Sequence, residues 1–532
     1  MSSPQDITDK WTSIVRVPPP RKIRPGNRVD YWIDGRDAFE SMYEAIQTTF
    51  SGECAKYYIY LLAWWLDDDV ALSSKPKSTF SDLISWASYK NVEVRVILWA
   101  NPFRVTSLQE ARINKLSSAA ALIDIHQDLK QSDHQKLLIV NGNAGLFGFC
   151  GGIDIAKDRV QAVPMHTCSP FHDVHCRIFG DAAYDLVEVF AERWYRCPGY
   201  GELKVDKRSL RCLPDGPPSR PRRVLPPGTK VGDRHVGILR TYVPSPCRCI
   251  EEASIGRTIL NAIRGARRFI YIEDQYMVYA EARDESGEYR DVASALGERL
   301  DSLQHITILI PHSVISDLPK KWESRLNFMD MVLKKTSPQT AKTVQEAVGR
   351  QRAGSPLKRP YPKFRMFFKY EPPKGRSPID IGAGEGRFRK YYPEDFGPGS
   401  YVHSKVWIFD DELAIIGSAN CNRRGWNYDS EVAAAIFDRA PSPEKGRYSF
   451  AQQLRIKLWA KHLRLGEDDT RVVNGIEVEG QECCWFTSDA RQYVRLYNPA
   501  ESTDAPTGVA QWESLADPPG CLKRYDSCST RR

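Results

Sequence analysis

The chain has 532 residues, a length that allows several domains and a large buried core. Its net charge of +8 is a mild bias, which suits an anionic substrate or surface without requiring one. The polar start, MSSPQDITDKW, lacks the apolar core of a signal peptide, and no run approaches the ~18 apolar residues of a membrane span. We therefore expect a cytoplasmic or peripheral membrane protein without a signal peptide or transmembrane segment. Thirteen cysteines without metal-ligand spacing predict reduced thiols and no zinc site.

The first 211 residues alternate short β-rich runs with helical stretches. The most apolar run, YYIYLLAWWL at 57–66, is too short to span a membrane and is closed by three aspartates, so it predicts a buried strand. Residues 37–50 and 78–90 have the pattern of helices. Strands that alternate with helices predict an α/β sheet covered by helices on both faces.

A stretch rich in proline, glycine and arginine at 212–233 predicts a linker. Beyond it the β-rich runs recur in the same order, as RRFIYIEDQYM, HITILIPHS, HSKVWIF and LAIIGSANCNRRGW. An internal duplication of about 200 residues is too long for a solenoid repeat. It predicts two similar α/β lobes related by a pseudo-twofold, residues 1–211 and 234–532, each a mixed β-sheet flanked by helices.

The stretch from about Lys334 to Gly399 is polar and basic, and we expect it to be an insertion in the second lobe. It could be a solvated surface segment, or a basic lid or rim over the site in front of YVHSK. Charge runs usually face water, which favours the solvated segment.

The same set of reactive residues occurs once in each lobe. HQK at 134–136 and HSK at 403–405 each place a histidine and a lysine two apart in a strand, so both side chains leave the same face. Downstream lie a glycine-rich turn and then an acid before a valine. The candidate residues are His134, Lys136, Gly151, Gly152, Asp154 and Asp173 in the first lobe, and His403, Lys405, Ser418, Asn420 and Glu431 in the second.

Two imidazoles, two ammonium groups and amide or hydroxyl donors around one point are what phosphodiester cleavage requires. One histidine can attack phosphorus to give a phosphohistidine while the other protonates the leaving oxygen. Fixed cationic and neutral donors stabilise the equatorial oxygens, and an acid behind each histidine fixes its tautomer. Because lysine can neutralise phosphate, we expect no metal or cofactor. One copy alone would be weak support, but two copies in register predict one shared site at the lobe interface.

These residues resemble the phospholipase D superfamily, whose signature, HxKx4D followed by a GG or GS turn, occurs twice. The similarity to eukaryotic-type phospholipases D extends from about residue 57 to 463. It includes FCGGIDIAKDR, FHDVHCRIFGDAAYDLVEVFAERW, RFIYIEDQYM, YVHSKVWIFDDELAIIGSANCNRRGWNYDSEV and QLRIKLWAKHL. The resemblance implies a two-lobed fold with one interfacial site, and hydrolysis or transphosphatidylation of glycerophospholipids through a phosphohistidine.

The resemblance also implies a role for each residue. His134 and His403 are the nucleophile and the general acid/base, and His134 is favoured as the nucleophile. The phosphate is held by Lys136, Lys405, Ser418 and Asn420. Asp173 and Glu431 orient the histidines.

The sequence departs from the family pattern in two ways. Asn141 stands where the signature has an aspartate, but at roughly 3.3 Å per residue it lies ~15 Å or more from Lys136, so we expect the change to be tolerated. Only about 50 residues precede the first core strand. They leave no room for the calcium-binding β-sandwich or the phosphoinositide-binding modules of larger relatives.

Three functions fit this pattern. The first is a phospholipid-directed phosphodiesterase or transphosphatidylase that acts peripherally at a membrane surface. The second applies the same chemistry to nucleic acid or another non-lipid diester, and the third is a catalytically silent binding relative. The chain matches no recognised nucleic-acid-binding module. We therefore expect a phospholipid surface as the partner, no nucleic acid, and a monomer.

Overall fold

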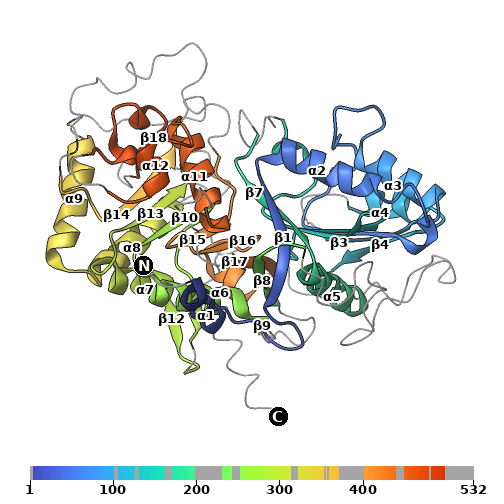
Figure 1. The fold of residues 1–532 in the computed structure, drawn as a ribbon, viewed down its shortest axis with the longest axis horizontal. Coiled ribbons are helices and arrows are strands. Elements are labelled where there is room, and N and C mark those ends of the chain that lie inside the picture. The colour runs from blue at the N-terminus through green and yellow to red at the C-terminus, as the bar shows by residue number, and fades with distance from the viewer. Residues whose placement is uncertain are drawn as a thin grey trace.

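The computed structural model shows two α/β lobes side by side (Figure 1). It describes residues 4–100, 106–125, 131–161, 170–197, 231–242, 252–284, 286–312, 321–352, 355, 357, 359–370, 401–438, 448–477 and 481–497. The predicted linker at 212–233 lies outside these residues except for its last three positions.

The first lobe contributes seven strands to the main sheet. They are β1 (Arg24–Ile33), β2 (Tyr58–Ala63), β3 (Glu93–Trp99), β4 (Ala119–Asp124), β5 (Leu137–Gly142), β6 (Gly145–Gly151) and β7 (Val174–Phe179). The second lobe contributes β8 (Arg234–Tyr242), β9 (Glu252–Ala253), β10 (Phe269–Glu273), β13 (His305–Ile310), β14 (Phe364–Lys369), β15 (Val406–Phe409), β16 (Leu413–Gly417), β17 (Glu431–Phe437) and β18 (Val494–Leu496). A separate two-stranded sheet pairs β11 (Glu281–Arg283) with β12 (Tyr289–Asp291).

Within the described residues, sixteen strands form one continuous sheet. Its order is β18-β14-β13-β10-β15-β16-β17-β8-β1-β7-β6-β5-β2-β3-β4, with β9 paired to β8. Apart from β18, which adds an antiparallel strand beyond β14, the order is symmetrical about the β1–β8 junction. In each lobe three consecutive strands run parallel (β2-β3-β4 and β10-β13-β14). The internal duplication and the predicted two-lobed α/β fold are therefore confirmed.

Helices cover both faces of this sheet. One face packs under α5 (Asp181–Arg196) and α11 (Phe450–Leu463). The other packs under α2 (Gly35–Gln47) and α3 (Phe80–Tyr89) in the first lobe, and under α6 (Ser254–Gly265), α7 (Val292–Leu300) and α8 (Lys321–Lys334) in the second. Burial on both faces explains why β2 reads as an unbroken apolar run rather than an alternating one. The remaining α-helices are α4 (Ser107–Ile113), α9 (Pro338–Arg352), α10 (Arg423–Asn427) and α12 (Thr470–Asn474).

The prediction of an insertion from Lys334 to Gly399 is wrong for part of this stretch. β14 pairs in parallel with β13 and is buried throughout, so it is the second-lobe counterpart of β4. Its charged residues made it look solvated, but Arg365 is buried beside Glu477 and Cys483. Helix α9 also falls in this stretch, and residues 371–399 lie outside the described part of the chain.

The first helix departs from the predicted lobe boundary. Although it begins the chain, α1 (Pro4–Ile14) packs on the second lobe, as Figure 1 shows. Trp11 is fully buried, and its Nε1–H donates to Glu412 Oε2 at 2.9 Å. Lys10 Nζ lies 3.1 Å from Asp410 Oδ2. Among the described residues, no helix combines the length and the apolar character needed to cross a membrane.

Candidate active site

Two short backbone bridges join the lobes at the centre of the sheet. Asp133 pairs with Ser430, and His172 pairs with Val402, each as an isolated parallel bridge. The four residues immediately precede the two candidate histidines and the two candidate acids in the chain. Each bridge therefore sets a histidine of one lobe opposite an acid of the other.

Each imidazole is held by the acid that its bridge brings to it. His134 Nδ1 lies 3.0 and 3.1 Å from the two carboxylate oxygens of Glu431, and His403 Nδ1 lies 2.6 Å from Asp173 Oδ2. An Nδ1–H that donates to a carboxylate leaves Nε2 as the reactive nitrogen of each ring. The sequence predicted these four residues but not the exchange of acids between lobes.

The two lysines are buried and differently held. Lys136 Nζ forms an ion pair with Asp154 Oδ2 at 3.0 Å and donates to the backbone oxygen of His134 at 3.2 Å. Lys405 Nζ donates to Gln275 Oε1 at 3.1 Å and to the backbone oxygen of His403. The first ammonium group thus contacts a carboxylate directly, whereas the second contacts neutral oxygens.

The glycine-rich turns support the acids. A Cβ at Gly152 would lie 2.0 Å from Asp173 Oδ1, so the acid occupies the space that a side chain would need. Gly151 adjoins the same strand, because its Cβ would lie 2.5 Å from the backbone oxygen of Val174. In the second lobe Ser418 is fully buried, and its hydroxyl donates to Glu431 Oε2.

Three predicted substrate contacts take different positions. The Ser418 hydroxyl is bonded to Glu431, so it positions an acid. Asp154 is buried and accepts the backbone N–H groups of Trp64 and Trp65 at 3.1 and 3.2 Å, so it is placed to hold Lys136. The side-chain oxygen of Asn420 is buried without a hydrogen-bond partner among the described residues. Asn420 therefore remains a candidate for contact with substrate.

The electrostatic surroundings favour neutral imidazoles before substrate binds. Burial, and then the nearby Lys136 and Lys405, hold the pKa of His134 well below its usual range. The pKa of His403 is lowered by burial, then by Arg159 and the two lysines. A neutral Nε2 is the form that can attack phosphorus.

Sequence reasoning missed an aromatic wall beside His134. The Trp64 ring lies edge-on to the His134 ring at 5.6 Å, and it stacks on Trp99 at 5.7 Å. Lys136 Nζ lies 5.5 Å from the centre of the Trp64 ring. The tryptophan pair near the end of YYIYLLAWWL could have predicted this wall, because side chains at the carboxyl ends of strands in open α/β sheets commonly line sites. Arg159, which lies beside His403, was also missed.

A buried His–Glu–His cluster lies behind the second histidine motif. The possible ligand atoms of His172, Glu273 and His462 lie within 4.8 Å of one another, a spacing that could hold a metal ion. Both Glu273 oxygens, however, already accept two hydrogen bonds each. The donors are His172 Nε2 and Ser404 Oγ on Oε2, and His462 Nε2 and the Tyr271 hydroxyl on Oε1. The Glu273 carboxylate is therefore already satisfied by hydrogen bonds from its neighbours.

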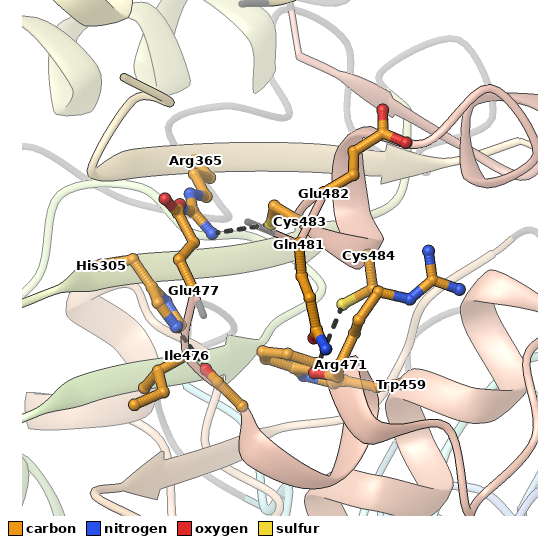
Figure 2. Close-up of a pocket in the computed structure, with 11 residues that line it drawn as sticks. His305, Arg365, Trp459, Arg471, Ile476, Glu477, Gln481, Glu482, Cys483 and Cys484 are labelled. Carbon is orange, nitrogen blue, oxygen red and sulfur yellow. Dashed lines mark hydrogen bonds and ion pairs between the residues drawn. The ribbon is translucent and has the colours of Figure 1, made fainter. Parts of the chain in front are cut away.

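A small pocket in the second lobe is separate from this centre (Figure 2). His305, Arg365 and Cys483 are among the residues that line it. His305 pairs with Phe269, so the pocket lies at the amino ends of these parallel strands. Glu273, at the carboxyl end of β10, instead reaches the catalytic region.

The chain is similar to known proteins in sequence and in fold. Residues 380–456 match a family model described as "Cardiolipin synthase, PLD-like domain". The chain is 24% identical over 590 residues to phospholipase D alpha 2 of Oryza sativa subsp. japonica, covering 89% of this chain and 68% of that protein. It is 25% identical over 627 residues to phospholipase D gamma 2 of Arabidopsis thaliana, covering 92% and 69%. The fold is similar to a crystal structure of phosphatidylserine synthase from Haemophilus influenzae Rd KW20, with a TM-score of 0.51, 10% identity and 99% of both chains covered.

The fold and the site define a duplicated two-lobed protein with one histidine–lysine pair from each lobe. The similarity to named phospholipases D extends over most of the chain. The chain is therefore similar to the phospholipase D superfamily in sequence and in fold.

In the second lobe, the residue that corresponds to Asn141 has a structural role. Its counterpart Asp410 accepts the backbone N–H groups of Arg267, Arg268 and Phe269 at 2.7 to 3.1 Å. That carboxylate fastens the end of β15 to the start of β10, away from His403. Asn141 is likewise the fifth of the six residues of β5 and is buried.

We expect Asn141→Asp to change kcat/KM by less than about threefold, because the position is a strand's length from both imidazoles. Asp410→Asn should instead lower the free energy of unfolding by about 1–3 kcal/mol, because a carboxylate that accepts several backbone donors is lost. Steady-state kinetics on a phosphodiester and urea unfolding measure the two effects. A hundredfold rise in activity for Asn141→Asp would contradict this assignment.

Lys405 should set a pH limit on the free enzyme. Burial lowers the pKa of Lys405 to about 7. The ammonium form therefore disappears as pH rises through 7, and an anionic phosphate then loses a partner. We expect kcat/KM for a water-soluble diester to fall above pH 7, while kcat holds to higher pH because bound phosphate restores the ammonium form. Lys405→Arg should move the fall in kcat/KM to higher pH, since arginine stays charged. Superimposable profiles for the two proteins would refute this role.

Proposed function

We propose that the chain is a phospholipase D-type phosphodiesterase, which cleaves or exchanges the headgroup of glycerophospholipids through a phosphohistidine. The observation that carries the proposal is the crossed pairing of His134 with Glu431 and of His403 with Asp173 at 2.6 to 3.1 Å. It gives one centre two oriented imidazoles, and the buried Lys136 and Lys405 lie beside them. Relatives named phospholipase D support the lipid as substrate.

In the first step Nε2 of His134 attacks phosphorus, and the phosphorus–oxygen bond to the headgroup alcohol breaks. His403 gives its Nε2 proton to the departing oxygen, so the headgroup leaves as a neutral hydroxyl. Burial and the neighbouring positive charges keep the rings neutral, and the substrate anion offsets those charges and so favours protonation of His403. Lys136 and Lys405 stabilise the equatorial oxygens as charge builds on them.

In the second step His403, now neutral, takes a proton from water or from an alcohol. The resulting oxygen nucleophile attacks the phosphohistidine and restores His134. Water gives phosphatidate, and an alcohol gives a new phosphatidyl ester. Asp173 and Glu431 hold the two rings in place through both steps, which preserves the in-line geometry that the displacement needs.

The lipid would be reached from the membrane surface. No helix among the described residues could cross a bilayer, so we assign peripheral contact. The aromatic wall of Trp64 and Trp99 beside His134 gives the site an amphipathic side, which suits a substrate with a charged phosphate and an apolar body.

The direct test incubates the purified protein with phosphatidylcholine and ethanol, with and without a chelator. We expect phosphatidylethanol in both conditions. His134→Ala and His403→Ala should each lower its formation by about 10³-fold or more, because the two imidazoles act as a unit. His235→Ala is the matched control, since this half-buried histidine packs on Phe437 outside the site and should keep full activity.

Two results would contradict this proposal. Cleavage of a nucleic acid or a generic diester with no product from any lipid would indicate the same chemistry on another substrate. Inactivity on every diester tested would indicate a binding protein.

A further inference from the structure

A buried arginine faces the reactive edge of His403. Arg159 ends the 3₁₀ turn Lys157–Arg159, five residues beyond Asp154, and is only 3% exposed. Its Nη2 lies 3.5 Å from His403 Nε2, the nitrogen left free by the bond to Asp173. The guanidinium carbon lies 4.8 Å from the centre of the Phe171 ring, which supports it from one side.

The Arg159 guanidinium forms ion pairs with Asp154, Asp158 and Asp173, but its hydrogen bonds are incomplete. Its Nε and Nη1 have no hydrogen-bond partner among the described residues. The carboxylates of Asp154 and Asp173 lie 3.9 Å away, beyond hydrogen-bond distance, and Asp158 Oδ1 is 3.3 Å from Nη1 without hydrogen-bond geometry. Buried donors without acceptors cost about 1–3 kcal/mol each, so this arrangement is suited to an acceptor that arrives with substrate.

In the second lobe the comparable guanidinium is already held by an acid. The corresponding turn carries Arg424, but its Nε and Nη2 donate to the two oxygens of Asp429, both at 2.9 Å. That guanidinium is already neutralised by a two-point contact. The two lobes therefore differ at this point, because the guanidinium with unbonded N–H groups, Arg159, lies beside His403.

We propose that Arg159 is a catalytic residue that binds a non-bridging oxygen of the phosphoryl group. This inference rests on the proposed phosphodiester chemistry and adds a third cation to the two lysines. A planar guanidinium can hold a tetrahedral oxyanion at two points, which an ammonium cannot. As Arg159 turns its donors to the phosphoryl oxygens, it also releases Nε2 of His403, which can then carry the proton for the leaving group.

The test measures binding of tungstate, a tetrahedral oxyanion, to the full-length protein by calorimetry. We expect Arg159→Gln to weaken tungstate binding by about 10- to 100-fold, the loss of a hydrogen bond to a charged group. Arg159→Lys should weaken tungstate binding less, because lysine keeps the positive charge but loses the planar two-point contact. Arg95→Gln is the matched control, since it also removes a buried guanidinium, but one bound to Glu93 outside the site.

Thermal unfolding separates this role from a structural one. Because Arg159 Nε and Nη1 make no hydrogen bond, neither variant should melt lower than Arg95→Gln, while both should lose oxyanion affinity. Tungstate affinity equal to wild type in Arg159→Gln or in Arg159→Lys would overturn the proposal, as would no tungstate binding by wild type. Failure of the lipid assay with Arg159-dependent tungstate binding intact would refute the lipid substrate and leave Arg159 in place.

Discussion

Two backbone bridges between the lobes hold the proposed catalytic centre together. At the first bridge, the backbone N–H of His134 donates to the backbone oxygen of Ser430 at 2.9 Å. At the second bridge, the backbone N–H of His403 donates to the backbone oxygen of His172 at 2.8 Å. These bonds fix each imidazole next to an acid of the other lobe. Neither lobe alone holds an oriented histidine, so the duplication makes a single site that exists only when both halves pack together.

The symmetry is useful for building the site and its breaking is useful for the reaction. A displacement at phosphorus needs one nucleophile and one acid, so two identical halves would serve it poorly. Lys136 contacts a carboxylate, whereas Lys405 contacts an amide. The strand pairing also shows that Trp64 of the first lobe occupies the position of Gln275 in the second. Together with Arg159, these differences give the two histidines unlike surroundings, from which unlike roles can follow.

The repeat explains what the sequence could predict. Two copies of a histidine–lysine pair in register indicated the two-lobed fold and predicted the candidate reacting groups, because a shared site needs both copies. The crossing of the acids could not be predicted, since it depends on contacts between residues that are 297 and 230 positions apart in the chain. Arg159 follows the glycine-rich turn at a position the second lobe does not repeat. β14 was missed because the charged residues Arg365 and Lys369 predicted a solvent-exposed segment. The partners that allow Arg365 to be buried, Glu477 and Cys483, lie more than 100 residues away in the chain.

The most direct test of the crossed site is a set of double-mutant cycles on the free energy of unfolding. Alanine substitutions at Asp173 and His403, and at Glu431 and His134, should each show a coupling of about 0.5–3 kcal/mol, as expected for side chains in contact. The same-lobe pair of Asp173 with His134 should couple by less than about 0.5 kcal/mol. Equal or stronger coupling within a lobe would contradict the account, because each acid would then serve the histidine of its own half.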